Sequence, residues 1–161
     1  GVRKDNYYLR IWHTSNAQVD FPTPLSADSW HHVVYTRSAV PGSEVGKIYL
    51  NGVLLGTEDP DDSWFKSASD GEFWYLGTDI DIGPPPKKSQ NYAGLMDEVA
   101  LWRTALSLAQ IQTLYIQGRS FDIAVNMSTE LVAYWDFDGD GVDGSSPSYT
   151  ATVNEAIYTG F

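Results

Sequence analysis

The sequence predicts an all-β protein built from antiparallel strands, with one short α-helix. Several segments alternate polar and apolar residues with the period of two that is typical of strands. Between two of them stands Asn51-Gly52, a strong hairpin signal because both residues tolerate the positive φ of a type I′ turn. Only the segment from Ser107 to Gly118 changes to helical spacing, with a capping signature at each end.

The N-terminal half contains three predicted strands. The first covers residues 7–13, and a loop with Pro22 and Pro24 follows it. Residues 31–37 and 47–50 form the next two strands, and the hairpin turn comes directly after them. These marks predict antiparallel pairing of consecutive strands.

The middle of the chain is predicted to be less regular. Residues 58–71 are polar and acidic, which indicates an exposed loop carrying Trp64. Residues 73–76 form another short strand. Residues 84–88 read P-P-P-K-K, which predicts a stiff surface excursion that cannot pair in a sheet.

The predicted helix lies between two further strands, at residues 95–102 and 131–137. Ser107, with Gln110 three positions later, forms a capping-box signature, and Gly118 stands where a left-handed C-cap belongs. The apolar positions at helical spacing are Leu106, Ile111, Leu114 and Tyr115. A strand therefore leads into one amphipathic helix.

Four segments follow one another in a characteristic order. They are W-H-H-V-V-Y-T at 30–36, K-I-Y-L-N-G-V-L-L-G at 47–56, Y-L-G at 75–77 and G-L-M-D-E-V-A-L-W-R-T-A-L-S-L-A-Q-I-Q-T-L-Y at 94–115. Together they resemble the laminin-G-like domains of the concanavalin A-like lectin and glucanase superfamily, over residues 29–118. The resemblance implies an antiparallel β-sandwich, or jelly roll, with one short helix. It says less about function, because one fold hosts many sites.

The length fits a single domain over residues 1–161. Residues 131–161 resemble the segment that usually opens a domain of this type, yet here they stand at the end. Either they complete the sandwich as a permuted or swapped edge, or they begin a second copy that is cut off at Phe161. No flexible linker precedes them, so we favour one domain.

Composition excludes several classes of function. The formal net charge is −11 and the chain has no cysteine, so nucleic acid, anionic membranes, disulfides and thiolate metal sites are not expected. No apolar run approaches the roughly 20 residues that span a bilayer, so we expect no membrane insertion.

Catalysis is not expected either. The chain has no G-x-S-x-G nucleophile elbow and no E-x-D-x-x-E string of the kind found in laminarinase-type hydrolases with this fold. Adjacent His31 and His32 would point to opposite faces of a strand and could not act together. A carboxylate pair two residues apart, Asp79 and Asp81, is the enzymatic alternative.

Calcium is the cofactor that the acidic loops suggest. Asp136, Asp138 and Asp140 match the start of a D-x-D-x-D-G calcium loop, but the twelfth position is Pro147 instead of Glu, which argues against an EF-hand. The resemblance implies a different structural site, with Asp97 as a ligand near residues 136–143. The competing interpretation is that these carboxylates only serve turn chemistry on a solvated surface.

Carbohydrate is the ligand most often associated with this fold when no active site is visible, and it requires an exposed aromatic face with polar neighbours. Trp64 lies in an acidic loop with no periodic reason for burial, although it could also fold back as a plug. The candidate glycan-binding residues are Trp64, Trp12, Tyr92, Asp79 and Asp81. Three other tryptophans are expected in the core: Trp30, Trp102 and Trp135.

The sequence therefore predicts a noncatalytic, lectin-like recognition module that binds a polysaccharide or glycan on an extracellular, cell-surface or virion protein. The alternative is a structural or protein-interaction module, such as a part of a phage fibre, a decoration protein or an adhesin repeat, that contacts other protein subunits.

Overall fold

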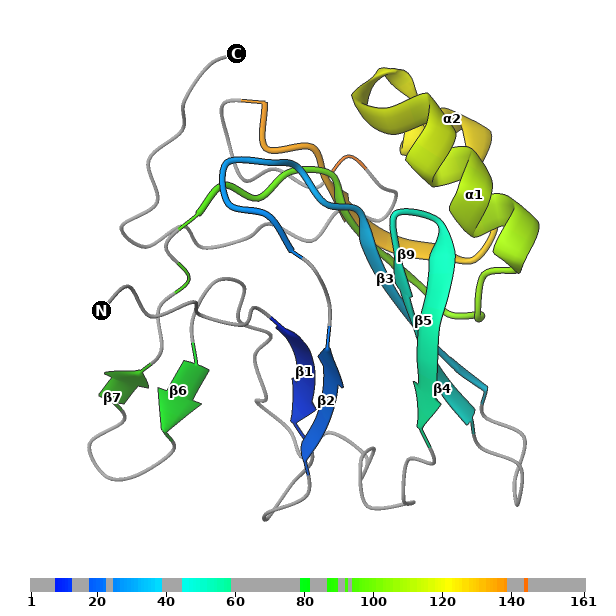
Figure 1. The fold of residues 1–161 in the computed structure, drawn as a ribbon. Helices are drawn as coiled ribbons and strands as arrows, with labels where there is room; N and C mark the ends of the chain where they lie inside the picture. Colours follow the sequence, from blue (N-terminus) through cyan, green and yellow to red (C-terminus); the bar gives the residue numbers. More distant parts are fainter. Residues whose placement is uncertain are drawn as a thin grey trace.

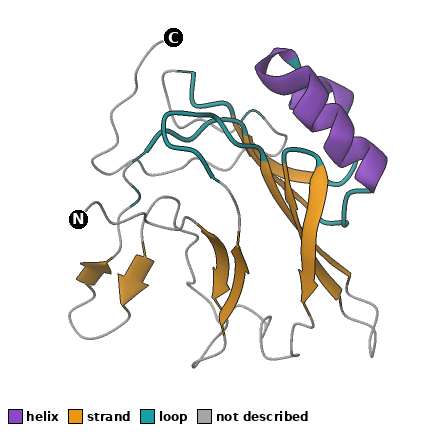
Figure 2. Cartoon of the chain, in the orientation of Figure 1, coloured by secondary structure: helices purple, strands orange, loops and turns teal. Residues whose placement is uncertain are grey.

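A computed structural model of the chain describes residues 8–12, 18–22, 25–38, 45–58, 79–81, 87–89, 92, 94–138 and 144 (Figure 1). Within these residues the fold is dominated by antiparallel strands, with one helix of ten residues and two shorter helical turns (Figure 2). The predicted antiparallel β character is confirmed. Among the described helices, none has the length and apolar character needed to cross a membrane.

The largest described sheet has the strand order β3-β4-β5, formed by Val33–Ser38, Val45–Leu50 and Val53–Glu58. Leu50 pairs with Val53, so two residues connect β4 to β5. These residues, Asn51 and Gly52, have φ angles of 51° and 75°. The predicted type I′ turn is therefore confirmed.

A second hairpin pairs β1 (Tyr8–Trp12) with β2 (Gln18–Pro22). The prediction of a loop around Pro22 was wrong at this point, because Pro22 is the last residue of β2, and β2 is an edge strand of the described sheet, where a missing N–H group is tolerated. Phe21 of β2 is buried against Gly56 of β5, where an added Cβ would come within 2.6 Å of the ring. The two hairpins are therefore in contact.

A short ladder pairs β6 (Asp79–Asp81) with β7 (Lys87–Ser89). The predicted unpaired excursion over residues 84–88 was wrong for Lys87 and Lys88, which pair with Asp81 and Ile80. Proline cannot donate to a ladder, but that restriction does not extend to the lysines after it.

Strand β8 (Val99–Trp102) pairs with β9 (Leu131–Trp135). Both strands are shorter than predicted. Glu98 and Phe137 have φ angles of 55° and 54°, which interrupt the extended backbone just before β8 and two residues after β9. The pairing joins the start of residues 131–161 to the strand that precedes the helix, while the single domain over residues 1–161 stays a prediction.

Helix α1 (Leu108–Gln117) has the predicted capping box at its N-terminus. The Ser107 side chain accepts a hydrogen bond from the Gln110 N–H, and the Gln110 side chain accepts from the Ser107 N–H. Gly118 ends the helix at the predicted position, but the prediction of a left-handed cap was wrong, because its φ of 55° is combined with a ψ of −150°. The turn η2 (Gly118–Ser120) and the helix α2 (Ile123–Asn126), capped by Asp122, were not predicted.

The core lies between these helices and the strands (Figure 1). Ile111 of α1 is fully buried and clusters with Tyr49 of β4, Ile123 of α2 and Tyr134 of β9. Helix α1 and strand β9 therefore belong to the same core cluster as Tyr49 of β4.

Candidate functional site

Tyr92 is an exposed aromatic side chain that is held in place. It is 57% exposed, and its hydroxyl donates a hydrogen bond of 3.3 Å to the Leu95 carbonyl. The ring lies over Gly94, where an added Cβ would come within 2.6 Å of the ring carbon Cζ and of the hydroxyl oxygen. Glycine at position 94 therefore allows the ring to fold against the backbone, with much of its surface left to solvent.

The other candidate glycan-binding residues are described only in part. Trp64 lies outside the described residues. Trp12 stands on β1, and Asp79 and Asp81 stand two positions apart on β6, as the sequence predicts, but their side chains are not among those described. Their assembly with Tyr92 into one site stays a prediction.

Trp30 corrects a prediction. It was expected in the core, yet its side chain is 53% exposed. The reason is that β3 begins only at Val33, so Trp30 belongs to the loop before the strand and not to its buried face. Trp102 and Trp135 are half-buried, and the Trp102 indole N–H donates a hydrogen bond of 3.0 Å to the Met127 carbonyl.

Four acidic side chains gather where β8 begins and β9 ends: Asp97, Glu98, Asp136 and Asp138. Arg119, in η2, lies between two of them. Arg119 Nε is 2.5 Å from Asp97 Oδ2, and Arg119 Nη2 is 3.2 Å from Asp138 Oδ1. We call these five residues the acidic cluster. Arg119 was not predicted from the sequence, because its partners come from two distant strand ends.

The acidic cluster contains more acidic than basic side chains. The Asp97 side chain is only 9% exposed, and burial raises its pKa, with Arg119 opposing the rise and Asp138 adding to it. Burial also raises the pKa of Glu98, although a hydrogen bond of 2.5 Å from the Tyr134 hydroxyl opposes this rise. The cluster contains four carboxyl groups and a single guanidinium, which pairs with two of them, so it favours an additional positive charge or a proton.

The donor set fits calcium only in part. Asp97 Oδ2 is buried and lies 2.5 Å from Arg119 Nε, so a cation at this oxygen would have to displace the guanidinium. Asp136 Oδ1 is already used, because it accepts a hydrogen bond of 3.2 Å from the Asp138 N–H and so stabilises its own turn. In the described part of the chain, no three His, Cys, Asp or Glu side chains converge closely enough to hold an ion. Asp140 lies outside it, and the calcium site stays a prediction.

The two adjacent histidines contact different neighbours. His31 Nε2 lies 3.1 Å from the Ser26 carbonyl oxygen, and the His32 ring stacks on Tyr115 of α1 with centroids 6.1 Å apart. Burial lowers the pKa of His32, which favours the neutral ring at neutral pH. His32 therefore packs the helix onto the sheet.

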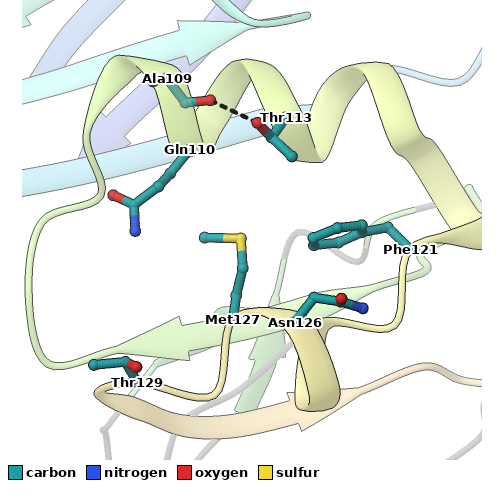
Figure 3. Close-up of a pocket in the computed structure, with 7 residues that line it drawn as sticks. All are labelled: Ala109, Gln110, Thr113, Phe121, Asn126, Met127 and Thr129. Carbon is teal, nitrogen blue, oxygen red and sulfur yellow. Dashed lines mark hydrogen bonds between the residues drawn. The ribbon is translucent and has the colours of Figure 1, made fainter.

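A hollow that sequence reasoning missed lies between α1, α2 and the residues that follow α2 (Figure 3). Its volume is about 310 Å³, and it is lined by Ala109, Gln110, Thr113, Phe121, Asn126, Met127 and Thr129. Polar positions on α1 look like an ordinary solvated helix face in the sequence. They face a hollow only because α2, which was not predicted, folds back beside α1.

Comparison with known proteins identifies the family. The laminin-G-type family model described as the concanavalin A-like lectin/glucanases superfamily matches residues 1–112, well over half of the 161 residues. The comparisons with curated proteins and with solved structures gave no match.

Proposed function

Because the chain belongs to the concanavalin A-like lectin/glucanases superfamily, as a laminin-G-like domain, we propose that it is a noncatalytic recognition module that binds carbohydrate. The antiparallel sheets close into a jelly-roll β-sandwich in this proposal, and the module acts on an extracellular, cell-surface or virion protein. Its partner is a polysaccharide or glycan.

The observation that carries the proposal is the fixed, exposed ring of Tyr92. A pyranose places its apolar C–H face on an aromatic ring, and a ring that is already immobilised loses little entropy on binding. The hydrogen bond to Leu95 and the contact with Gly94 provide this immobilisation. Trp64 and Trp12 would extend the aromatic surface, and Asp79 and Asp81 would accept hydrogen bonds from sugar hydroxyls.

A glycan array, followed by titration of the best ligand, tests the proposal. We expect Tyr92→Ala and Trp64→Ala each to weaken binding about tenfold, the equivalent of roughly 1.4 kcal/mol. Gly94→Ala should weaken it as well, because the new methyl group displaces the Tyr92 ring without removing it. The matched control is Tyr115→Ala, which removes another exposed tyrosine at a different place.

Two results would count against carbohydrate binding at this site. One is an array without any ligand. The other is a ligand whose affinity responds equally to Tyr92→Ala and Tyr115→Ala. Release of reducing sugar from mixed polysaccharides that disappears in Asp79→Asn would instead support the enzymatic alternative.

A protein-interaction module is the second candidate, and an exposed apolar surface favours it. Large apolar side chains of the β4-β5 hairpin and of α1 are exposed: Val53, Leu54, Tyr115 and Ile116. Tyr115 joins the two elements, because a Cβ at Gly52 would come within 3.1 Å of its ring. Patches of this kind often mark contacts with other subunits of an assembly. An empty glycan array together with loss of assembly in Ile116→Gln would favour this function.

Calcium binding at the acidic cluster is a further part of the proposal. Its support is the excess of carboxylates around Asp97, to which Asp140 would add a ligand. The thermal midpoint should rise by several degrees in millimolar calcium relative to a chelator. In Asp97→Asn this calcium-dependent rise should vanish, whatever happens to the midpoint itself. Equal midpoints of the unaltered protein in calcium and in chelator would contradict the site.

A further inference from the structure

The hollow between α1 and α2 has a fixed apolar floor. Phe121 and Met127 are half-buried and pack against the core cluster on their inner sides. The backbone of Met127 is held twice, since its carbonyl accepts from Trp102 at 3.0 Å and its N–H donates to Ile123 at 2.9 Å. In Figure 3 both side chains point into the space below α1. The floor is therefore part of the folded core.

Three polar side chains border this floor, and hydrogen bonds to nearby residues of the chain orient each of them. Gln110 Oε1 accepts from the Ser107 N–H at 2.9 Å and from the Ser107 hydroxyl at 2.8 Å, which leaves both hydrogens of Nε2 for a ligand. Asn126 Nδ2 donates to the Asp122 carbonyl at 2.8 Å, which leaves Oδ1 as an acceptor. Thr113 Oγ1 donates to the Ala109 carbonyl at 2.9 Å, so its lone pairs remain available (Figure 3). The hollow thus offers one donor and two acceptors in fixed positions.

The charge and size of the hollow restrict its ligand. None of the seven lining residues is ionisable, so no side chain there can anchor a charged group. A volume of about 310 Å³ is at the lower end of the range for small-molecule sites, roughly 300–1,000 Å³. A ligand that matches must be neutral and small, with hydroxyl groups along its edge and C–H groups on its face.

We propose that this hollow is a second binding site, which takes a single neutral pyranose ring. The C–H face of the sugar lies on Phe121 and Met127, and its hydroxyls bond to Gln110, Asn126 and Thr113. The site is distinct from the aromatic site at Tyr92. It uses the same class of ligand as the proposed function but does not require the Tyr92 site to bind.

Amide-resolved NMR titration of the ¹⁵N-labelled chain with methyl glucoside, methyl galactoside and methyl mannoside tests the proposal. At about 0.3 kcal/mol per non-hydrogen atom, a methyl hexoside reaches a Kd on the order of 1 mM. We expect one of the three sugars to shift the side-chain amides of Gln110 and Asn126 and the backbone amides of Thr113 and Met127, with saturation.

Three variants separate specific binding from a loss of structure. Ala109→Trp places a large side chain at an exposed position on the rim and should abolish the shifts by filling the hollow. Thr113→Val removes one hydroxyl at nearly constant shape and should raise the Kd about threefold to tenfold. Thr104→Val is the matched control, because Thr104 is exposed and does not line the hollow. Unchanged spectra elsewhere establish that each variant is folded.

The outcome is decided by where the shifts occur. Saturable shifts at the hollow that are lost in Ala109→Trp support the second site, including when Tyr92→Ala has no effect. If none of the three sugars gives shifts there at about 20 mM, or if Ala109→Trp leaves them unchanged, the second site is wrong. Shifts confined to Tyr92 and its neighbours overturn the second site and support the proposed function. Shifts at the hollow without any shift at Tyr92 support the second site and count against the proposed function.

Discussion

Arg119 shows how a single residue can hold two distant strand ends together. It pairs with Asp97 before β8 and with Asp138 after β9. The Asp97 side chain is 9% exposed, whereas that of Asp138 is 71% exposed. The two ion pairs are therefore unequal, because water screens the exposed pair much more strongly.

The first prediction follows from this inequality. Arg119→Gln should lower the free energy of unfolding at neutral pH by about 1–2 kcal/mol, because it leaves buried Asp97 beside three other carboxylates. This value is below the range for fully buried pairs because the arginine is itself 46% exposed. Urea denaturation measures the change.

Asp138→Asn is the control for this prediction. It removes only the exposed partner and should change the stability by no more than about 0.5 kcal/mol. Equal effects of the two substitutions would mean that Arg119 acts through something other than its contact with Asp97.

The positions of single side chains were predicted from the sequence only in part. Asp97, Asp136 and Asp138 were predicted to come together, and the structure places them in one cluster with Glu98. Arg119 could not be predicted, because no local pattern connects it to a carboxylate more than one helix away. Trp30 was assigned to the core from its place beside a strand, and its exposure depends on where that strand begins.

At the scale of elements, local signals gave reliable predictions. The type I′ turn and the capping box at Ser107 depend on residues that are neighbours in sequence, so the sequence contains all the information that forms them. The strand limits, η2 and α2 depend on tertiary contacts. Strand β8 starts late because Glu98 turns to meet Tyr134, which comes 36 positions later. The hollow could not be predicted for the same reason, since it exists only where α1 and α2 meet.

The hairpin turn provides a prediction for one element. Asn51 has positive φ, its Oδ1 accepts from the His32 N–H at 2.9 Å, and its own N–H donates to the His32 carbonyl at 2.8 Å. Asn51→Ala should lower the free energy of unfolding by about 1–3 kcal/mol, because it strains the turn and leaves the His32 N–H without its partner.

Asn51→Asp is the matched variant in thermal unfolding. It retains an acceptor oxygen and tolerates positive φ, so most of the stability should return. If Asn51→Asp is as unstable as Asn51→Ala, the side-chain hydrogen bond is not what stabilises the turn.

For the molecule as a whole, the raised pKa values of Asp97 and Glu98 predict how stability depends on pH. A carboxyl group with a raised pKa in the folded state stabilises the fold below its unfolded pKa, and this contribution is lost as the pH rises through the folded pKa. Glu98→Gln retains an oxygen that can accept from Tyr134 but cannot ionise. The variant should therefore gain stability relative to the original chain as the pH rises from about 4.5 to 7.5.

Comparing the two chains at each pH removes the contribution of groups that they share. One of these groups is His32, whose lowered pKa acts in the opposite direction and destabilises the fold as the pH falls. A constant difference between the two unfolding curves across this range would show that Glu98 titrates normally. The raised pKa would then be wrong.

The cluster of Tyr49, Ile111 and Tyr134 has a consequence for biosynthesis. The family match ends at residue 112, but Tyr134 of β9 is needed to finish this core. On the ribosome, the β4-β5 hairpin can close within microseconds of leaving the exit tunnel, yet the cluster around Tyr49 stays incomplete until α1, α2 and finally β9 have emerged. Contacts over such long separations slow refolding to milliseconds or longer. During that interval the nascent chain presents an apolar strand face to chaperones, and it stops doing so when Tyr134 arrives.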